Sequence, residues 1–142
     1  MDRRMNARSA FTHIMATQPS MALATQAEGG PNVRVVNFCW QPESRRVYFA
    51  TFPDNDKVAE IDACPRVTFT TIPSVGNAHV RAHGLCRRSS FTVRDVAADI
   101  VAKVPDYQET VDAFGNVLVL FEIEFAKAEV TIELGQTEWI EL

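Results

Sequence analysis

Apolar residues recur along the chain with a helical period in some segments and with alternation in others. Helical spacing predicts a helix at residues 7–15 that ends before Pro19, another at residues 93–104 that Pro105 stops, and a short one at residues 107–114. A further short helix is expected between Asp54, in the N-cap position, and the Cys64-Pro65 pair.

Runs of β-branched and aromatic residues, bounded by Pro, Gly or Asn, predict the strands. The polar segment 41–46 separates two of these runs, so residues 33–40 and 47–52 are expected to form an antiparallel pair. The full set of runs covers residues 21–25, 33–40, 47–52, 67–72, 78–87, 117–125 and 130–134.

Short helices placed at connections, rather than alternating with strands, favour an antiparallel barrel over a parallel α/β sheet. We therefore predict a mainly β fold with peripheral α-helices, in which residues 1–142 form one domain around a six-stranded antiparallel β-barrel. The first helix is expected to cover this barrel. Because side chains fill the interior of small barrels, a ligand is expected outside the barrel or between subunits.

Composition narrows the possible partners. The chain has 14 Lys and Arg against 18 Asp and Glu, a net charge of -4, which disfavours nucleic acid and acidic membrane surfaces. Its three cysteines are odd in number and widely spaced, so we expect buried, reduced thiols rather than disulfides or a zinc site. No apolar run is long enough for a membrane helix, which predicts a soluble, cytoplasmic protein.

Two cationic residues point to an anion site. Arg34 lies among the apolar residues of a predicted strand, and Lys57 lies in the first turn of a predicted helix. A guanidinium can bind phosphate through two hydrogen bonds, and a helix start adds backbone donors and a favourable dipole. Alternatively, Arg34 pairs with a carboxylate such as Glu28 or points to solvent. For Lys57 the alternative is a solvated surface cluster with Asp54 and Asp56.

Three polar residues, His79, Arg81 and His83, share one face of the predicted strand 78–87. On a strand the two histidines lie about 13 Å apart, and with no third ligand obvious beside them no metal site is predicted. This cationic face suits an anionic or hydrogen-bonding ligand. The chain contains no nucleophile-base motif and no Gly-rich phosphate loop that would indicate a catalytic residue.

Five short motifs occur in a fixed order. They are R-V-V-N at residues 34–37, V-Y-F-A-T at 47–51, a helix-opening lysine at 57, C-P-R-V-T-F at 64–69 and H-V-R-A-H-G at 79–84. This order resembles the FMN-binding split-barrel family related to pyridoxamine 5'-phosphate oxidase, and in particular its general stress protein and nitroimidazole-resistance branch. The resemblance spans most of the chain.

The resemblance implies a homodimer of split barrels with FMN at the subunit seam. Arg34 and Lys57 would bind the FMN phosphate, and the partner's strand around His79 and Arg81 would complete the site. The isoalloxazine ring would be lined by the backbone of Val35, Val36 and Asn37 and by Phe49, Ala50 and Thr51.

The resemblance also implies an oxidoreductase that passes electrons from NAD(P)H to a small-molecule acceptor. In such a site the cofactor supplies the redox chemistry and the protein holds and shields it. The alternatives are a flavin-binding sensor or carrier without turnover, a relative that binds deazaflavin or haem, and a barrel that binds no cofactor.

Overall fold

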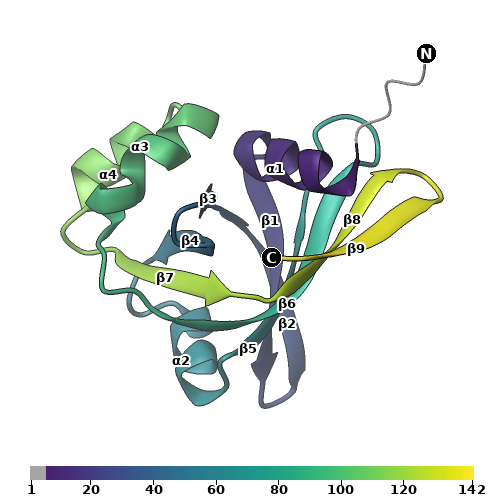
Figure 1. The fold of residues 1–142 in the computed structure, drawn as a ribbon. Helices are drawn as coiled ribbons and strands as arrows, with labels where there is room; N and C mark the ends of the chain where they lie inside the picture. Colours follow the sequence, from purple (N-terminus) through teal and green to yellow (C-terminus); the bar gives the residue numbers. More distant parts are fainter. Residues whose placement is uncertain (1–5) are drawn as a thin grey trace.

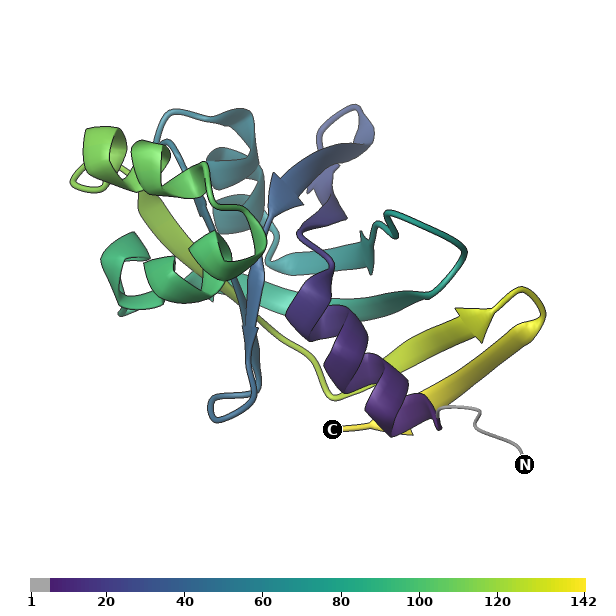
Figure 2. The same ribbon diagram turned by 90° about the horizontal axis from the view of Figure 1, so that it is seen from above.

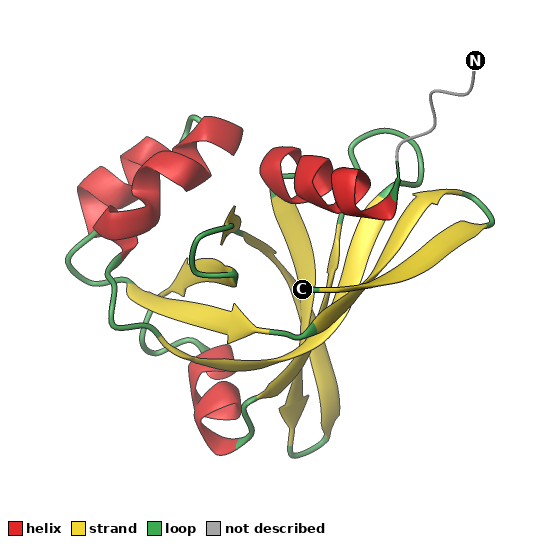
Figure 3. Cartoon of the chain, viewed as in Figure 1, coloured by secondary structure: helices red, strands yellow, loops and turns green. Residues whose placement is uncertain are grey.

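The computed structural model describes residues 6–142, which form one strongly curved sheet with helices at its periphery (Figure 1, Figure 3). The helices of this range are α1 (Ala7–Thr17), α2 (Asp56–Ala63), α3 (Val93–Lys103) and α4 (Tyr107–Phe114). Its strands are β1 (Ser20–Ala27), β2 (Gly30–Asn37), β3 (Cys39–Gln41), β4 (Arg46–Thr51), β5 (Arg66–Thr71), β6 (His79–Arg88), β7 (Val119–Glu124), β8 (Lys127–Glu133) and β9 (Gln136–Glu141). No helix in residues 6–142 has the length and apolar character needed to cross a membrane.

The sheet curls round until its two ends approach each other without pairing. Its order is β2-β1-β5-β6-β7-β4-β3, with β8 also paired to β6 and β9 paired to β8. Within the described residues β2 and β3 lie at opposite ends of this order, although only Phe38 separates them in the chain. The opening between β2 and β4, which contact each other but form no ladder, is called the split below.

Aromatic and aliphatic side chains fill the concave side of the sheet. Phe49 on β4 stacks on Phe121 of the neighbouring β7, with ring centroids 5.6 Å apart. α1 covers this core, and its Phe11 packs edge-on against Trp40 with centroids 5.3 Å apart. Figure 2 shows α1 lying between the α3–α4 pair and the β8–β9 hairpin. The expected position of the first helix over the barrel is thus confirmed.

The link between the two edge strands is held by a partly buried cation. Phe38 is fully buried, and the ammonium of Lys103, at the end of α3, lies 3.7 Å from the centroid of its ring. The same ammonium donates to the backbone carbonyls of Met15 and Gln18, at 3.2 and 3.0 Å. Burial lowers the pKa of Lys103 to about 8. The ring and the two carbonyls therefore stabilise a cation that burial disfavours, and they join α1 and α3 to the β2–β3 link.

The predicted mainly β fold with peripheral helices is confirmed, but two predictions about its strands are wrong. Residues 33–40 do not form one strand paired with residues 47–52. The run breaks at Phe38, so that β2 pairs with β1 and only Cys39–Gln41 pairs with β4. Residues 6–142 contain nine strands rather than six. β9 was missed because its sequence, Q-T-E-W-I-E, is mostly polar and buries only Ile140.

The start of α2 also differs by one residue from the prediction. Asn55, not Asp54, is the N-cap, and its side-chain oxygen accepts a hydrogen bond from the backbone N–H of Lys57 at 3.2 Å. Both residue types are good caps, so their order in the sequence does not decide between them.

The three thiols are free, but they are not equally buried. Cys39 and Cys86 are each 1% exposed, and burial raises the pKa of both to about 12. Cys64 ends α2 and is partly exposed, so the expectation of three buried thiols is wrong for this residue.

We expect a chromogenic disulfide reagent to modify one thiol per native chain at neutral pH and three after denaturation. The thiolate is the reactive form. Cys39 and Cys86 are buried, and their raised pKa keeps them as thiols at neutral pH. Cys64→Ser should leave the native protein unreactive while two thiols still react after denaturation. Rapid modification of Cys39 or Cys86 in the folded protein would contradict this assignment.

Candidate anion-binding site

Two cations and a threonine meet at the split. Arg34 lies on edge strand β2, Thr51 ends β4 on the other side of the split, and Lys57 lies in the first turn of α2. β3 pairs with β4, with Cys39 opposite Tyr48. β2, which precedes Phe38 in the chain, therefore lies beside the end of β4. Positions 34 and 57, far apart in the sequence, are thereby brought to one place.

Lys57 is a buried cation at this place. The residue is 6% exposed, and its ammonium donates to the hydroxyl of Thr51 at 2.7 Å. Burial, followed by the charge of Arg34, lowers the pKa of Lys57, whereas Glu60 acts in the opposite direction. Within residues 6–142 no carboxylate forms a salt bridge with this ammonium. The alternative of a solvated cluster with acidic neighbours is therefore wrong.

Arg34 is oriented by two partners on neighbouring elements. Its guanidinium donates to the Thr25 hydroxyl on β1 at 2.6 Å and to the Glu60 carboxylate on α2 at 3.0 Å. A carboxylate partner was one of the expected alternatives, but Glu28 was the wrong candidate, since Glu28 is exposed in the β1–β2 turn. These two bonds use two of the five N–H donors of a guanidinium.

Glu60 is the residue of this site that the sequence did not reveal. Its carboxylate accepts from Thr25 at 2.6 Å, from Asn32 at 2.8 Å and from Arg34. Hydrogen bonding from Thr25 first, and then from Arg34 and Asn32, lowers the pKa of this carboxyl. The signal available in the sequence was the spacing, because Glu60 lies three residues after Lys57 and so on the same face of α2.

The residues expected to line a ring are distributed along both edges of the split. The Val35 side chain is exposed, Val36 packs against the core, and the Asn37 amide donates to Ser20 and to the Pro19 carbonyl. The side chain of Phe49 is fully buried, so only its backbone is available, while Ala50 is partly buried. On these two edges the available groups are mainly backbone groups.

His79 and Arg81 do not join the cation pair within one chain. They lie on β6, where Arg81 pairs with Glu129 at 2.6 Å and the His79 ring contacts the Asn77 carbonyl at 2.7 Å. Residues 6–142 contain no group of three or more His, Cys, Asp or Glu side chains arranged to hold a metal ion.

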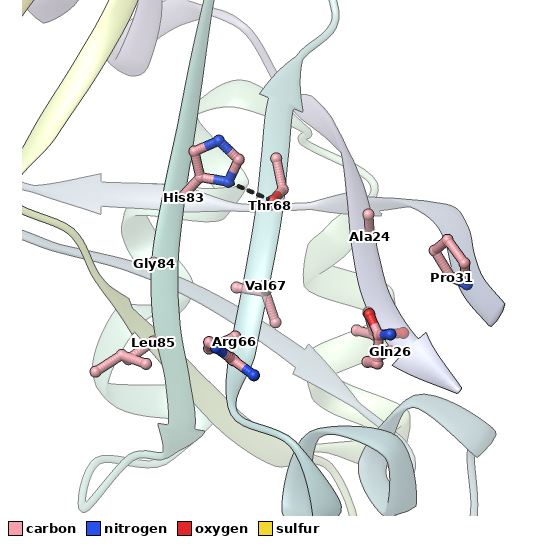
Figure 4. Close-up of a pocket in the computed structure, with 10 residues that line it drawn as sticks. Ala24, Gln26, Pro31, Arg66, Val67, Thr68, His83, Gly84 and Leu85 are labelled. Carbon is pink, nitrogen blue, oxygen red and sulfur yellow. Dashed lines mark hydrogen bonds between the residues drawn. The ribbon is translucent and has the colours of Figure 1, made fainter. Parts of the chain in front are cut away.

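A separate hollow of about 440 Å³ lies on the convex face of β1, β5 and β6 (Figure 4). Arg66, Thr68, His83 and Leu85 contribute to its lining. The His83 ring nitrogen Nδ1 lies 2.8 Å from the Thr68 hydroxyl, as the dashed line in Figure 4 marks. Neither Arg34 nor Lys57 lines this hollow, although Thr25, which accepts a hydrogen bond from Arg34, is one of its lining residues.

Chemically, the arrangement at the split suits binding of an anion rather than catalysis by the protein's own side chains. Arg34, Lys57 and Thr51 supply charged and neutral donors, while Glu60 cancels one of the two positive charges. The remaining single positive charge and the spare donors fit an anion such as a phosphate group. The unpaired strand edges beside it fit a planar, hydrogen-bonding ligand.

Comparison with known proteins gives a family and a fold. Residues 14–137 match the family model described as pyridoxamine 5'-phosphate oxidase-like. No curated protein matches the sequence.

Several solved structures share the fold at low sequence identity. A haem-binding protein from Mycobacterium smegmatis superposes with a TM-score of 0.77 at 15% identity over 99% of this chain, which spans only 60% of that protein. General Stress Protein 26 from Bacillus anthracis str. Sterne gives 0.73 at 16% identity, covering 97% of this chain and 100% of the other. A FAD-binding protein from Mesorhizobium loti gives 0.64 at 16% identity, covering 88% and 92%. At these identities the likeness shows the fold alone.

The burial of Lys57 predicts that the ligand-free protein is less stable than it could be. We expect Lys57→Met to raise the free energy of unfolding by about 1 kcal/mol, because an apolar side chain of similar length removes a desolvated charge and its repulsion from Arg34. Thermal unfolding at neutral pH measures this change as a rise in Tm of a few degrees.

The same variant should show a pH signature. The pKa of Lys57 in the folded state lies below its unfolded value, so the wild type gains stability as pH rises through this interval, and its deficit relative to Lys57→Met should shrink. Lys127→Met, at an exposed lysine, is the matched control for the loss of one lysine charge. A Lys57→Met protein less stable than wild type would contradict the prediction.

Proposed function

Because the chain belongs to the pyridoxamine 5'-phosphate oxidase-like family, we propose that it is an FMN-binding flavoprotein that transfers electrons from NAD(P)H to a small-molecule acceptor. The observation that carries the proposal is the buried, undercompensated Lys57 beside Arg34 at the split. A cation in this position lowers the stability of the ligand-free chain, and an anionic ligand offsets that loss.

The residues at the split fit the phosphate of FMN. Arg34, Lys57 and the hydroxyl of Thr51 would hold the phosphate, with the two cations supplying charge-assisted hydrogen bonds. The backbone of residues 35–37 and 49–51 would face the ring, because both segments lie along the split. Bound FMN supplies the hydride chemistry, which is consistent with the lack of a nucleophile-base pair at this place.

The proposal includes a homodimer formed through the convex face of the sheet. Strand registers place Val35, Ala22, Thr70 and Arg81 in one row across β2, β1, β5 and β6, and Val33, Ala24, Thr68 and His83 in the next row. Val33 and Val35 are 69% and 63% exposed, and small side chains lie beside them on β1. A smooth, partly apolar sheet face with a hollow in it suits a second copy of the same surface.

Such a dimer gives the polar residues of β6 a role. The partner's strand would bring its own copies of His79 and Arg81 toward the cofactor, where Arg81 is already held by Glu129. The site would then be complete only in the dimer.

Haem is the second candidate cofactor. It is favoured by one observation on the convex face, where exposed His83 has one ring nitrogen engaged by Thr68 and the other left for an iron. The haem-binding protein from Mycobacterium smegmatis shares the fold. The absorption spectrum of the purified protein separates a flavin from haem directly.

FMN is expected to bind with a dissociation constant in the low micromolar range or below. Arg34→Ala and Lys57→Met should each weaken binding by about tenfold or more, because each removes a charge-assisted hydrogen bond to phosphate. Fluorescence titration measures both constants, and riboflavin, which lacks the phosphate, should bind all three proteins alike. Arg94→Ala, at an exposed arginine bonded to Asn116, is the matched control and should bind FMN as wild type does. An absence of binding at FMN concentrations far above this range would overturn the proposal.

Turnover is tested on the loaded protein. NAD(P)H should bleach the bound flavin, and an added acceptor should restore its colour repeatedly. A sensor or carrier would bind FMN without this cycle.

The dimer is tested at the convex face. Val33→Glu should give the mass of a single chain in light scattering, since a carboxylate would be buried against a second apolar surface. Val75→Glu, at an apolar residue that is 90% exposed in the loop before β6, should leave the mass of two chains unchanged. Wild-type protein with the mass of one chain at high micromolar concentration would refute this interface.

A further inference from the structure

The carboxylate of Glu60 is the anion that pairs with Arg34 at the split, as a ligand phosphate would. It is 14% exposed and accepts hydrogen bonds from Thr25, Asn32 and Arg34, which come from β1 and β2, while it stands on α2 one turn beyond Lys57. The hydrogen bonds that this carboxylate accepts come from Arg34 itself, from Thr25, which also bonds Arg34, and from Asn32 on the same strand as Arg34. Glu60 is therefore part of the site rather than a neighbour of it.

The charges of the site imply that Glu60 and a bound phosphate repel each other and compete for the same two cations. Arg34 and Lys57 disfavour one another, and Glu60 is the negative charge that offsets them in the ligand-free protein. A phosphate bound to the same cations would do the same, and it would be repelled by Glu60 at short range in a partly desolvated place. Removing the carboxylate should then harm the empty site and favour the filled one.

We propose that Glu60 is an internal counter-anion that stabilises the empty site and limits the affinity of the phosphate-bearing ligand. This inference rests on the proposed function, since it names a residue that sets how tightly FMN is held. In this role Glu60 keeps Arg34 in place and keeps the net charge of the three side chains at one positive unit. It allows the chain to fold before the cofactor arrives and to release the cofactor afterwards.

Glu60→Gln tests the proposal because it removes the charge and keeps an acceptor for Thr25 and Arg34. Asn32 can turn its amide so that its oxygen accepts from the new glutamine. We expect the ligand-free variant to have a lower Tm than wild type, and to bind FMN roughly tenfold more tightly. Riboflavin affinity should not change. A residue that merely supports Arg34 would give weaker FMN binding together with the lower Tm.

Asp62→Asn is the matched control. Asp62 lies on the same helix and makes a 3.2 Å salt bridge to Arg88, with both side chains about half exposed. It involves the same change of charge, so a general electrostatic effect would appear in both variants. We expect its FMN affinity to stay within about twofold of wild type.

A double variant in which the two charge changes cancel provides a second test if Glu60→Gln does not fold. Lys57→Met/Glu60→Gln has the same net charge as wild type, and it should bind FMN more tightly than Lys57→Met alone. Equal or weaker binding in this comparison would overturn the proposal.

Inorganic phosphate separates this proposal from the flavin assignment. At matched ionic strength, phosphate should raise the Tm of Glu60→Gln more than that of wild type. If neither protein binds FMN and phosphate still acts in this way, the flavin assignment fails and the role of Glu60 stands. If wild type binds FMN and Glu60→Gln binds it equally or less tightly, the role of Glu60 fails and the flavin assignment stands. If neither FMN nor phosphate distinguishes the two proteins, the role of Glu60 fails as well.

Discussion

An unclosed sheet is the constraint on which the rest of this structure depends. Backbone N–H and C=O groups need partners, and a barrel normally supplies them by joining its first strand to its last. Here β2 and the end of β4 come together without forming a ladder. The fold therefore keeps two strand edges beside a cation pair, where a closed barrel would have had only side chains.

The cation pair is stabilised from outside the split. Stacked Phe49 and Phe121 and the cover provided by α1 form a continuous apolar core, which can tolerate a locally unfavourable charge on Lys57. Sites that bind charged groups commonly lower the stability of the folded protein in this way. Thr25, Asn32 and Glu60 reduce this loss of stability by orienting Arg34 before any ligand is present.

The sequence predicted the fold class, most helices and strands, and the meeting of Arg34 with Lys57, whose pKa is lowered by burial and then by the charge of Arg34. These features are set by local period and by motif order. Strand pairing at Phe38 was mispredicted because an apolar run does not show where the chain changes partner. Glu60 was missed because its importance arises only when α2 packs against β1 and β2, a contact between residues more than 25 positions apart.

Because a single residue, Phe38, links β2 to β3, the split is narrow at this link and widens away from it. The two edges are joined at this residue and diverge from it, so Asn37 and Ala50 lie near the apex while Arg34 and Lys57 lie toward the open end. A small rotation of the backbone at Phe38 would change the separation of the two cations more than the separation of the edges next to the link. Lys103 joins Phe38 to the ends of α1 and α3, so both helices are tied to the point where the two edges of the split meet.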